Sequence, residues 1–402
     1  MTVIMLKYKV MDDCYYAEMA VCLSCVPERT PTLLVKHSCW LYPYHPVPPL
    51  LLLVLRTTLL CPPLHLLILQ VMQGEKPWAL ISEVGGEHGY LEELADILQQ
   101  HFRTVCYSEL LLHRELYGPR IQALFIWKFC PLPDRSLLMS LPALKVISSG
   151  GVGVDHLDLT FINSLGVKVT NTPHVVSDAT ADMAMALLLS SARKILEGDI
   201  RCHRISVAPE TTKIPQRLMG FEVTGSTLGI IGMGEIGYKI AQRSRGFDMK
   251  ILYHNRTRRA VEEEREVEAC YCESLDDLLR MSDFVIVAVN LNSDTTGLIG
   301  WREMSLMKPT ATLVNISRGL VVEQDALVKA LQTGTIHAAA LDVTHPEPLP
   351  RDHPLLSLPN VLITPHLGIN TYTTARRMVQ RMLDNAQAVI NGLSIPDEVK
   401  LK

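Results

Sequence analysis

The sequence predicts an α/β protein with two doubly wound, mostly parallel sheets and a cleft between them. From Gly74 onward, short apolar runs alternate with longer amphipathic runs, an order typical of parallel strands joined by covering helices. The chain has 402 residues, enough for two domains with sizeable cores. Its composition, 48% hydrophobic and 20% charged, is typical of a globular protein.

Residues 1–71 differ in character, and we predict that they form an atypical, disordered N-terminal extension. They hold five of the ten cysteines and show no hydrophobic period. A Leu-rich stretch, residues 48–72, is cut by Arg56 and two prolines into runs shorter than the ~20 residues that a membrane-spanning helix needs. Cys22 and Cys25 have no second pair with which to form a zinc site. We therefore expect neither a membrane anchor nor a bound metal.

Charge and cysteine content narrow the partners that this chain is expected to have. The formal net charge is −4, so the chain lacks the basic excess of a nucleic-acid-binding protein. The other five cysteines are scattered, without the spacing of a disulfide framework. We expect a reducing, cytoplasmic location and small molecules as partners.

The first α/β unit is expected to comprise residues 72–172, completed by residues 365–402. Buried apolar runs predict its strands, and amphipathic runs predict the helices between them. The strands cover residues 78–82, 121–127, 145–149 and 167–171, and the helices cover residues 91–100 and 156–165. In the last helix, residues 371–391, methionines share one stripe with an alanine and a valine, which indicates core packing.

The second unit is expected to comprise residues 173–364. It opens with a helix, residues 178–193, which is apolar on all sides and should therefore be buried. Its predicted strands cover residues 228–231, 250–254, 284–289, 312–316, 338–342 and 361–364. Helices fill the gaps, so this unit is also a parallel sheet covered on both faces.

A glycine-rich motif follows the first strand of the second unit. Gly232, Gly234 and Gly237 form a G-x-G-x-x-G between that strand and a predicted helix. Glycines there permit a tight turn and close approach of the backbone. The helix N-terminus, with Glu235 and Ile236, presents free N–H groups to a pyrophosphate. In this context the motif predicts a nicotinamide dinucleotide site.

The end of the next strand indicates which dinucleotide binds. About 20 residues after the first glycine, an NAD site carries an Asp or Glu for the ribose 2′-hydroxyl. This chain has Asn255, Arg256, Thr257 and Arg258 there, and no acid before Glu262. Arg256 and Arg258 suit a 2′-phosphate, so we predict NADPH over NADH. The alternative is a solvated basic helix start, balanced by the acids that begin at Glu262.

A basic, an acidic and an imidazole side chain each follow one of the last three strands. They are Arg318, Glu347 and His366. The carboxyl ends of parallel strands bind ligands, so these side chains should converge. Reduction of a 2-keto acid needs a cation, a hydride donor and a proton donor, which makes the three a candidate catalytic set. The alternatives are structural roles without catalysis: Arg318 could cap a loop at a strand end, Glu347 could be an ordinary acidic loop residue, and His366 could be a buried core histidine.

From about residue 76 onward the chain resembles the D-isomer-specific 2-hydroxyacid dehydrogenase family, and within it the glyoxylate/hydroxypyruvate reductases and the similar 2-ketogluconate reductases. Several motifs in the family's order carry this resemblance: residues 151–156, 180–182, 232–237, 315–319, 341–350 and 365–368. The resemblance implies a flavodoxin-like substrate domain, a Rossmann cofactor domain and a homodimer.

The resemblance assigns roles to the candidate catalytic set. Arg318 is expected to bind the substrate carboxylate and to polarise the keto oxygen. His366 is expected to donate the proton in reduction and to accept it in oxidation, and Glu347 is expected to pair with the imidazole and favour its protonated form. Val152 and Gly153 are expected to offer backbone N–H groups to the carboxylate.

The resemblance also implies a cofactor set, a substrate class and no metal. Asp342 is expected to contact the nicotinamide end, and further cofactor-binding residues are Thr180, Glu235, Ile236, Asn290 and Ile316. The substrate is expected to be glyoxylate, hydroxypyruvate or 2-ketogluconate. Residues 207–219 lack the tryptophans that glyoxylate/hydroxypyruvate reductases carry there, which favours a more open pocket.

An alternative function is a nucleotide-sensing, corepressor-like binding protein of the same fold. Such corepressors favour NAD(H), and the missing acid after residues 250–254 argues against that role.

Overall fold

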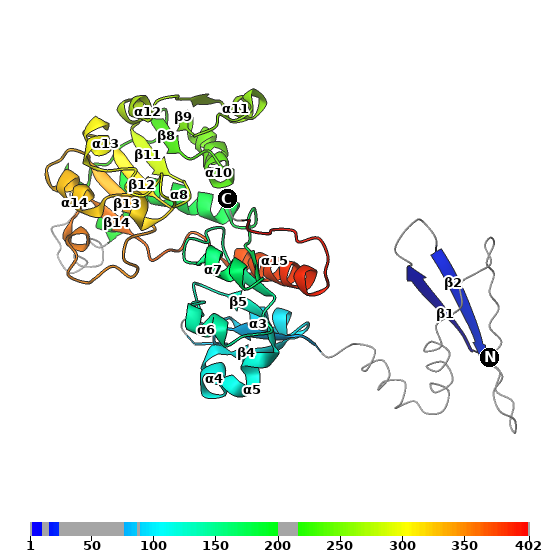
Figure 1. Cartoon of the computed structure of the whole chain (residues 1–402). Coiled ribbons are helices and arrows are strands. Elements are labelled where there is room, and N and C mark those ends of the chain that lie inside the picture. Colours follow the sequence, from blue (N-terminus) through cyan, green and yellow to red (C-terminus); the bar gives the residue numbers. More distant parts are fainter. Residues whose placement is uncertain (1, 10–15, 24–75, 87–88, 200–215, 401–402) are drawn as a thin grey trace, which may run out of the picture. The chain divides into compact units, whose positions relative to one another are not determined.

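The computed structural model describes residues 76–86, 89–199 and 216–400 together with the backbone of residues 2–9 and 16–23. The chain divides into two compact units, Met1–Glu75 and Lys76–Lys402. In the first unit, β1 (Thr2–Lys9) and β2 (Tyr16–Leu23) pair as antiparallel strands (Figure 1). These two strands lie within residues 1–71, all of which the sequence predicts to be disordered. The rest of this unit lies outside the described residues, so its disorder stays a prediction.

The first sheet of the larger unit has five parallel strands in the order β4-β3-β5-β6-β7. Because the first strand lies inside the sheet and the chain winds outward on both sides, the order is that of a flavodoxin-like sheet. The strands are β3 (Trp78–Ile81), β4 (Arg103–Cys106), β5 (Ile121–Ile126), β6 (Val146–Ser149) and β7 (Lys168–Thr170). The helices of this part are α3 (Glu92–Gln99), α4 (Tyr107–Leu112), α5 (Arg114–Tyr117), α6 (Arg135–Met139), α7 (Leu159–Ser164) and α15 (Tyr372–Ile390).

The second sheet has seven parallel strands in the order β10-β9-β8-β11-β12-β13-β14. Its direction of winding reverses at β8, as in a Rossmann sheet. The strands are β8 (Thr227–Ile231), β9 (Lys250–His254), β10 (Ala269–Tyr271), β11 (Phe284–Val287), β12 (Thr312–Asn315), β13 (Ala338–Leu341) and β14 (Val361–Ile363). The helices are α8 (Ser177–Ala192), α10 (Glu235–Ser244), α11 (Val261–Val267), α12 (Leu275–Met281), α13 (Trp301–Leu306) and α14 (Gln324–Gln332).

The predicted fold class, two doubly wound parallel sheets, is confirmed, and two strands were missed. Strands β4 and β10 each lie at one edge of a sheet. They have three or four residues, and only one residue in each is buried. Strands this short give a weak sequence pattern, so they were not predicted.

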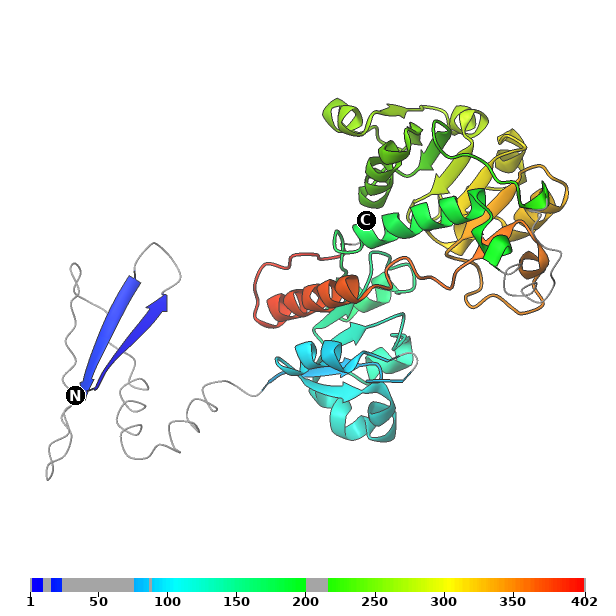
Figure 2. The same cartoon turned by 180° about the vertical axis from the view of Figure 1, so that it is seen from behind.

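The last helix returns to the first sheet. In Figures 1 and 2, α15 lies beside α3, and it packs against α3 and β6 although more than 200 residues separate it from either. Met378 and Met382 are fully buried in a core that they share with Phe125 of β5. The methionine stripe is therefore core packing, as predicted.

Helix α8 is buried, as its all-round apolar character predicted. It packs against α10 and against β12 and β13 of the second sheet. Ala181, Ala184 and Leu188 are fully buried there. The helix therefore covers one face of that sheet at β12 and β13.

Within the described ranges, no helix combines the length and apolar character needed to cross a membrane. In those ranges, no three or more His, Cys, Asp or Glu side chains cluster as metal ligands would. Residues 48–72 and the Cys22–Cys25 pair lie outside the residues whose side chains are described. The cytoplasmic location stays a prediction.

Candidate active site

Most of the predicted site residues follow the carboxyl ends of the strands of the second sheet. The glycine motif follows β8, Asn255–Thr257 follows β9 and Asn290 follows β11. Ile316 and Arg318 follow β12, Asp342 follows β13 and His366 follows β14. The order reverses at β8, so this edge includes the switch point at which open α/β sheets bind ligands.

Each glycine of the motif has a distinct physical reason. Gly232 has a φ of +100°, which side chains rarely permit, and a Cβ there would press on the Ala288 carbonyl. A Cβ at Gly237 would overlap the Gly232 carbonyl oxygen, whereas a Cβ at Gly234 would meet nothing within 4 Å. The loop is therefore tight where it turns and open where α10 begins. This arrangement fits the pyrophosphate of a dinucleotide.

The end of β9 supports the glycine loop from the side. The Asn255 side-chain oxygen accepts a hydrogen bond from the Met233 amide at 3.2 Å. Arg259 Nη1 donates to the Met233 carbonyl at 2.8 Å, and the same guanidinium pairs with Glu263 at 2.7 Å. Arg259 was not among the predicted site residues, because its role depends on the fold of this loop.

The two arginines assigned to a 2′-phosphate have different environments. Arg258 donates two hydrogen bonds, at 2.8 and 2.7 Å, to the buried Glu264. These bonds and one from Tyr253 lower the pKa of Glu264 to about 2, so this ion pair is permanent at neutral pH. Arg256 is exposed and has no hydrogen bond or ion pair within the described ranges. Arg258 is therefore engaged by Glu264, and the binding of a 2′-phosphate by Arg256 stays a prediction.

The Arg318 side chain reaches the loop that follows β6 of the first sheet. Its Nε donates to the Asp155 carboxylate at 3.0 Å and its Nη1 donates to the Ser317 carbonyl at 2.9 Å. A Cβ at Gly153 would overlap the guanidinium, so only glycine permits this approach. Val152 lies in the same loop, where its carbonyl accepts a hydrogen bond from Asn171. The two predicted substrate-binding segments therefore meet.

His366 and Glu347 form a hydrogen-bonded pair. His366 Nδ1 lies 2.9 Å from a Glu347 carboxylate oxygen, and each side chain keeps about a third or less of its surface exposed. Burial alone would raise the pKa of the Glu347 carboxyl. The bonds from His366 and the Thr344 amide, with the charges of His366 and Arg318, outweigh it and hold that pKa below its ordinary value. Glu347 is thus an anion at neutral pH and orients the imidazole.

Asp342 anchors the segment that carries His366. It is 2% exposed, and its carboxylate accepts bonds from Thr364 Oγ1 at 2.6 Å, from the Leu367 amide at 2.8 Å and from the Gly368 amide at 2.7 Å. Between these points His366 has a φ of +53°, a conformation that is unfavourable for residues other than glycine. This supporting contact was not predicted.

Other predicted cofactor residues lie at the same edge with their own contacts. Thr180 is buried in α8, where its hydroxyl donates to the Val176 carbonyl at 3.0 Å. Glu235 is exposed at the start of α10, 3.6 Å from His174 Nδ1. The carbonyl of Asn290 accepts a bond from the Thr295 hydroxyl at 2.6 Å.

Two residues that were not predicted as site residues from the sequence lie beside the candidate catalytic set. Asp155 belongs to the matched motif at residues 151–156, yet its partner, Arg318, is known only from the fold. The Phe129 ring centre is 5.8 Å from that of His366 and 5.1 Å from that of His156. Phe129 is 45% exposed with a φ of +64°, so it forms an apolar wall near the imidazole. Its position in a loop without a motif gave no signal.

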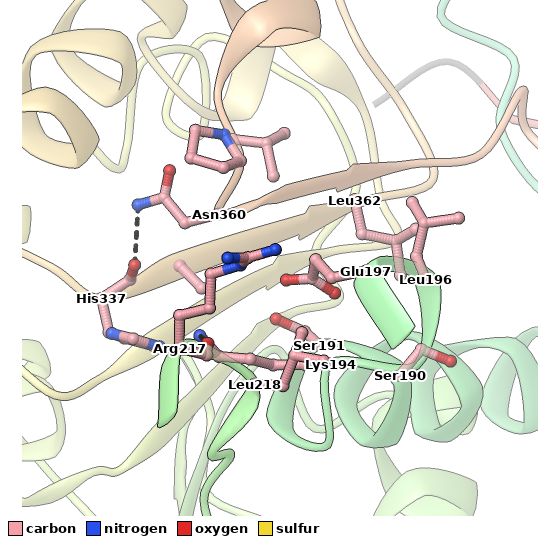
Figure 3. Close-up of a pocket in the computed structure, with 13 residues that line it drawn as sticks. Ser190, Ser191, Lys194, Leu196, Glu197, Arg217, Leu218, His337, Asn360 and Leu362 are labelled. Atoms are coloured by element: carbon pink, nitrogen blue, oxygen red, sulfur yellow. Dashed lines mark hydrogen bonds between the residues drawn. The ribbon is translucent and has the colours of Figure 1, made fainter. Parts of the chain in front are cut away.

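A cavity of about 300 Å³ lies elsewhere on the second sheet (Figure 3). It is lined by residues at the end of α8 and at the amino ends of β13 and β14, including Lys194, Arg217, His337 and Asn360. Because the candidate catalytic residues follow the opposite, carboxyl ends of these strands, this cavity is not the candidate active site.

Comparison with known proteins identifies the family. Residues 185–368 match the model of the D-isomer specific 2-hydroxyacid dehydrogenase NAD binding domain. Glyoxylate reductase of Thermococcus gammatolerans is 38% identical over 79% of this chain and 94% of its own length. The NADPH-dependent glyoxylate/hydroxypyruvate reductase of Sinorhizobium meliloti, solved with NADP and malonate, is 29% identical, with a TM-score of 0.70 over 81% of this chain and 97% of that one. D-mandelate dehydrogenase of Rhodotorula graminis is 27% identical, with a TM-score of 0.71 over 81% and 98%. The chain is therefore an oxidoreductase that belongs to the D-isomer specific 2-hydroxyacid dehydrogenase family.

Proposed function

We propose that this enzyme uses NADPH to reduce a small 2-keto acid, such as glyoxylate, hydroxypyruvate or 2-ketogluconate, to the D-2-hydroxy acid. The observation that carries the proposal is the pair of His366 and Glu347, 2.9 Å apart, on the strand edge that also bears the glycine motif. Arg318, on the same edge, supplies the cation that a 2-keto acid needs.

In this mechanism each side chain has one task. Arg318 binds the substrate carboxylate and polarises the keto oxygen, as backbone N–H groups of Val152 and Gly153 complete the carboxylate site. When bound, the nicotinamide would supply the hydride that the keto carbon needs. His366 gives the proton from Nε2 to the oxygen of that carbon, and Glu347 stabilises the imidazolium through Nδ1. Oxidation uses the same groups in reverse.

The cofactor residues are proposed because they lie along the same edge of the second sheet, around the glycine motif. The amides of Gly234, Glu235, Ile236 and Gly237 open α10 and are placed to bind pyrophosphate. Asn255, Arg256 and Thr257 are proposed to bind the adenosine ribose and its 2′-phosphate. Thr180, Asn290, Ile316 and Asp342 are proposed to line the site up to the nicotinamide.

Replacing Arg256 by alanine is expected to raise KM for NADPH about tenfold and to leave KM for NADH within a factor of two. The reason is loss of one charge-assisted hydrogen bond to the 2′-phosphate. Steady-state kinetics with both cofactors measures the effect. Arg265→Ala, a change of similar charge in α11, is the control. Equal kcat/KM for NADPH and NADH in the wild type would contradict the proposed preference.

Comparison of kcat/KM for glyoxylate, hydroxypyruvate and 2-ketogluconate tests the substrate. The tryptophan-poor region, residues 207–219, lies mostly outside the described residues. We expect 2-ketogluconate to be reduced with at least a tenth of the kcat/KM of glyoxylate, because a more open pocket admits the longer acid. Absence of turnover with all three acids would overturn the proposed activity and revive the nucleotide-sensing alternative.

A homodimer is also proposed, as the resemblance implies. Apolar side chains are exposed near the end of α8, where Ile195 is 54% and Met219 74% exposed. These exposed side chains could contact a second copy of the chain. The apolar residues of α8 are largely buried within the chain and are therefore poorer candidates for an interface. A monomeric mass in solution would overturn this proposal.

A further inference from the structure

The Arg318 guanidinium presents two edges, and the fold engages Nε and Nη1 but not Nη2 within the described ranges. Arginine has five N–H donors in a fixed plane. The Nε donor points to Asp155, with 3.0 and 3.2 Å to its two carboxylate oxygens, and one Nη1 donor points to the Ser317 carbonyl at 2.9 Å. Nη2 donates to no residue within the described ranges, and it lies against Gly153.

The partner of Nε comes from the other sheet. Asp155 follows β6, whereas Arg318 follows β12, and their side chains are 27% and 23% exposed. The loop between β6 and Asp155 includes Val152 and Gly153, the proposed backbone ligands of the substrate carboxylate. One short segment therefore carries both the anion that holds Arg318 and Gly153, which lies against Nη2.

We propose that Asp155 is a positioning residue, whose carboxylate holds the Nε edge of Arg318 so that the Nη edge faces the substrate carboxylate. The inference rests on the proposed function for the identity of the substrate. It goes beyond that function because it assigns a task to Asp155, whose carboxylate contacts Arg318. It also explains the glycine at position 153, since any side chain there would displace the oriented guanidinium.

The direction in which KM changes when Asp155 is removed distinguishes a positioning role from competition with the substrate. As an anion beside Arg318, Asp155 reduces the positive charge available to a substrate carboxylate. If it only competed with substrate, its removal would lower KM. If it orients the guanidinium, its removal lets a long, flexible side chain leave the productive geometry, and KM rises.

Asp155→Ala is expected to raise KM for glyoxylate about tenfold, the usual effect of losing a hydrogen bond to a charged group. KM for NADPH should stay within a factor of two. Asp155→Asn keeps an oxygen acceptor for Nε and should recover KM to within about threefold of the wild type. Asp158→Ala, in the same loop but paired with Arg135 at 3.0 Å, controls for loosening of the loop.

A double-mutant cycle with Arg318→Lys decides whether Asp155 acts through Arg318. Lysine has no Nε edge of this geometry, so adding Asp155→Ala to Arg318→Lys should change KM less than twofold. A full additional tenfold loss, or a KM that Asp155→Ala leaves unchanged or lowers, would overturn the proposal.

Calorimetric titration with oxalate repeats the Asp155→Ala and Arg318→Lys double-mutant cycle with a binding constant, so that it needs no catalytic turnover. Oxalate carries the carboxylate that Arg318 is proposed to bind, and its Kd is measured on the full-length protein with NADPH present. A tenfold weaker Kd in Asp155→Ala, absent in the Arg318→Lys background, supports positioning even if no 2-keto acid is reduced. A wild-type protein that binds oxalate but turns over nothing would overturn only the proposed function.

Discussion

Replacement of His366 by alanine is expected to lower kcat for 2-keto acid reduction about a thousandfold. A positioned general acid contributes about 10²- to 10⁴-fold, and His366 Nδ1 lies 2.9 Å from a Glu347 carboxylate oxygen that orients the proposed proton donor. The forming alkoxide would have to take its proton from water instead. Stopped-flow or steady-state assay of NADPH oxidation with saturating glyoxylate measures the loss.

The control for this prediction is cofactor binding. His366 follows β14, whereas the pyrophosphate is proposed to bind at α10 after β8, so the Kd for NADPH should change less than twofold. Retention of a tenth or more of the wild-type kcat would refute the assignment of His366 as proton donor.

A Glu347→Gln variant tests the other half of the pair. It keeps the shape of the side chain and removes the charge that stabilises the imidazolium. Reduction should therefore lose about tenfold in kcat, the usual effect of losing a hydrogen bond to a charged group, as measured by steady-state assay with saturating glyoxylate. An unchanged kcat would show that Glu347 acts only as a neutral hydrogen-bond partner.

Inner strands and sequence motifs could be predicted because their signals are local. Strands such as β8 and β12 are continuous apolar runs, buried on both faces, and the glycines of the motif follow directly from the turn that they make. The convergence of Arg318, Glu347 and His366 follows from the rule that parallel strands end at one edge. These parts needed no knowledge of distant contacts.

The remainder depends on contacts between segments far apart in the chain. Arg256 and Arg258 are two residues apart and chemically alike, yet only Arg258 faces the buried Glu264. Asp155 and Arg318 are separated by 163 residues, and no spacing rule links them. Edge strands β4 and β10 are short and half-exposed, so pairing with a neighbour decides their structure rather than their own composition.

Asp342→Ala is expected to damage both stability and catalysis, because one buried carboxylate satisfies three donors around His366. Its removal leaves Thr364 Oγ1 and the amides of Leu367 and Gly368 without their acceptor. A buried donor left unsatisfied costs about 1–3 kcal/mol; the Gly368 bond is buried and the other two are part-buried, so the free energy of unfolding should fall by about 2 kcal/mol. Urea denaturation monitored by circular dichroism measures this loss.

The same change should lower kcat about a hundredfold even where the protein is fully folded. His366 has a φ of +53°, and the Asp342 carboxylate fixes the amides of Leu367 and Gly368 that follow it. Once released, the backbone relaxes and carries the imidazole away from its productive position. Asp342→Asn keeps an oxygen for Thr364 and Leu367 but turns an NH₂ group toward the Gly368 amide, so its kcat should lie between those of the wild type and Asp342→Ala. If Asp342→Ala unfolded more easily but kept wild-type kcat at low temperature, the carboxylate would stabilise the fold without positioning His366.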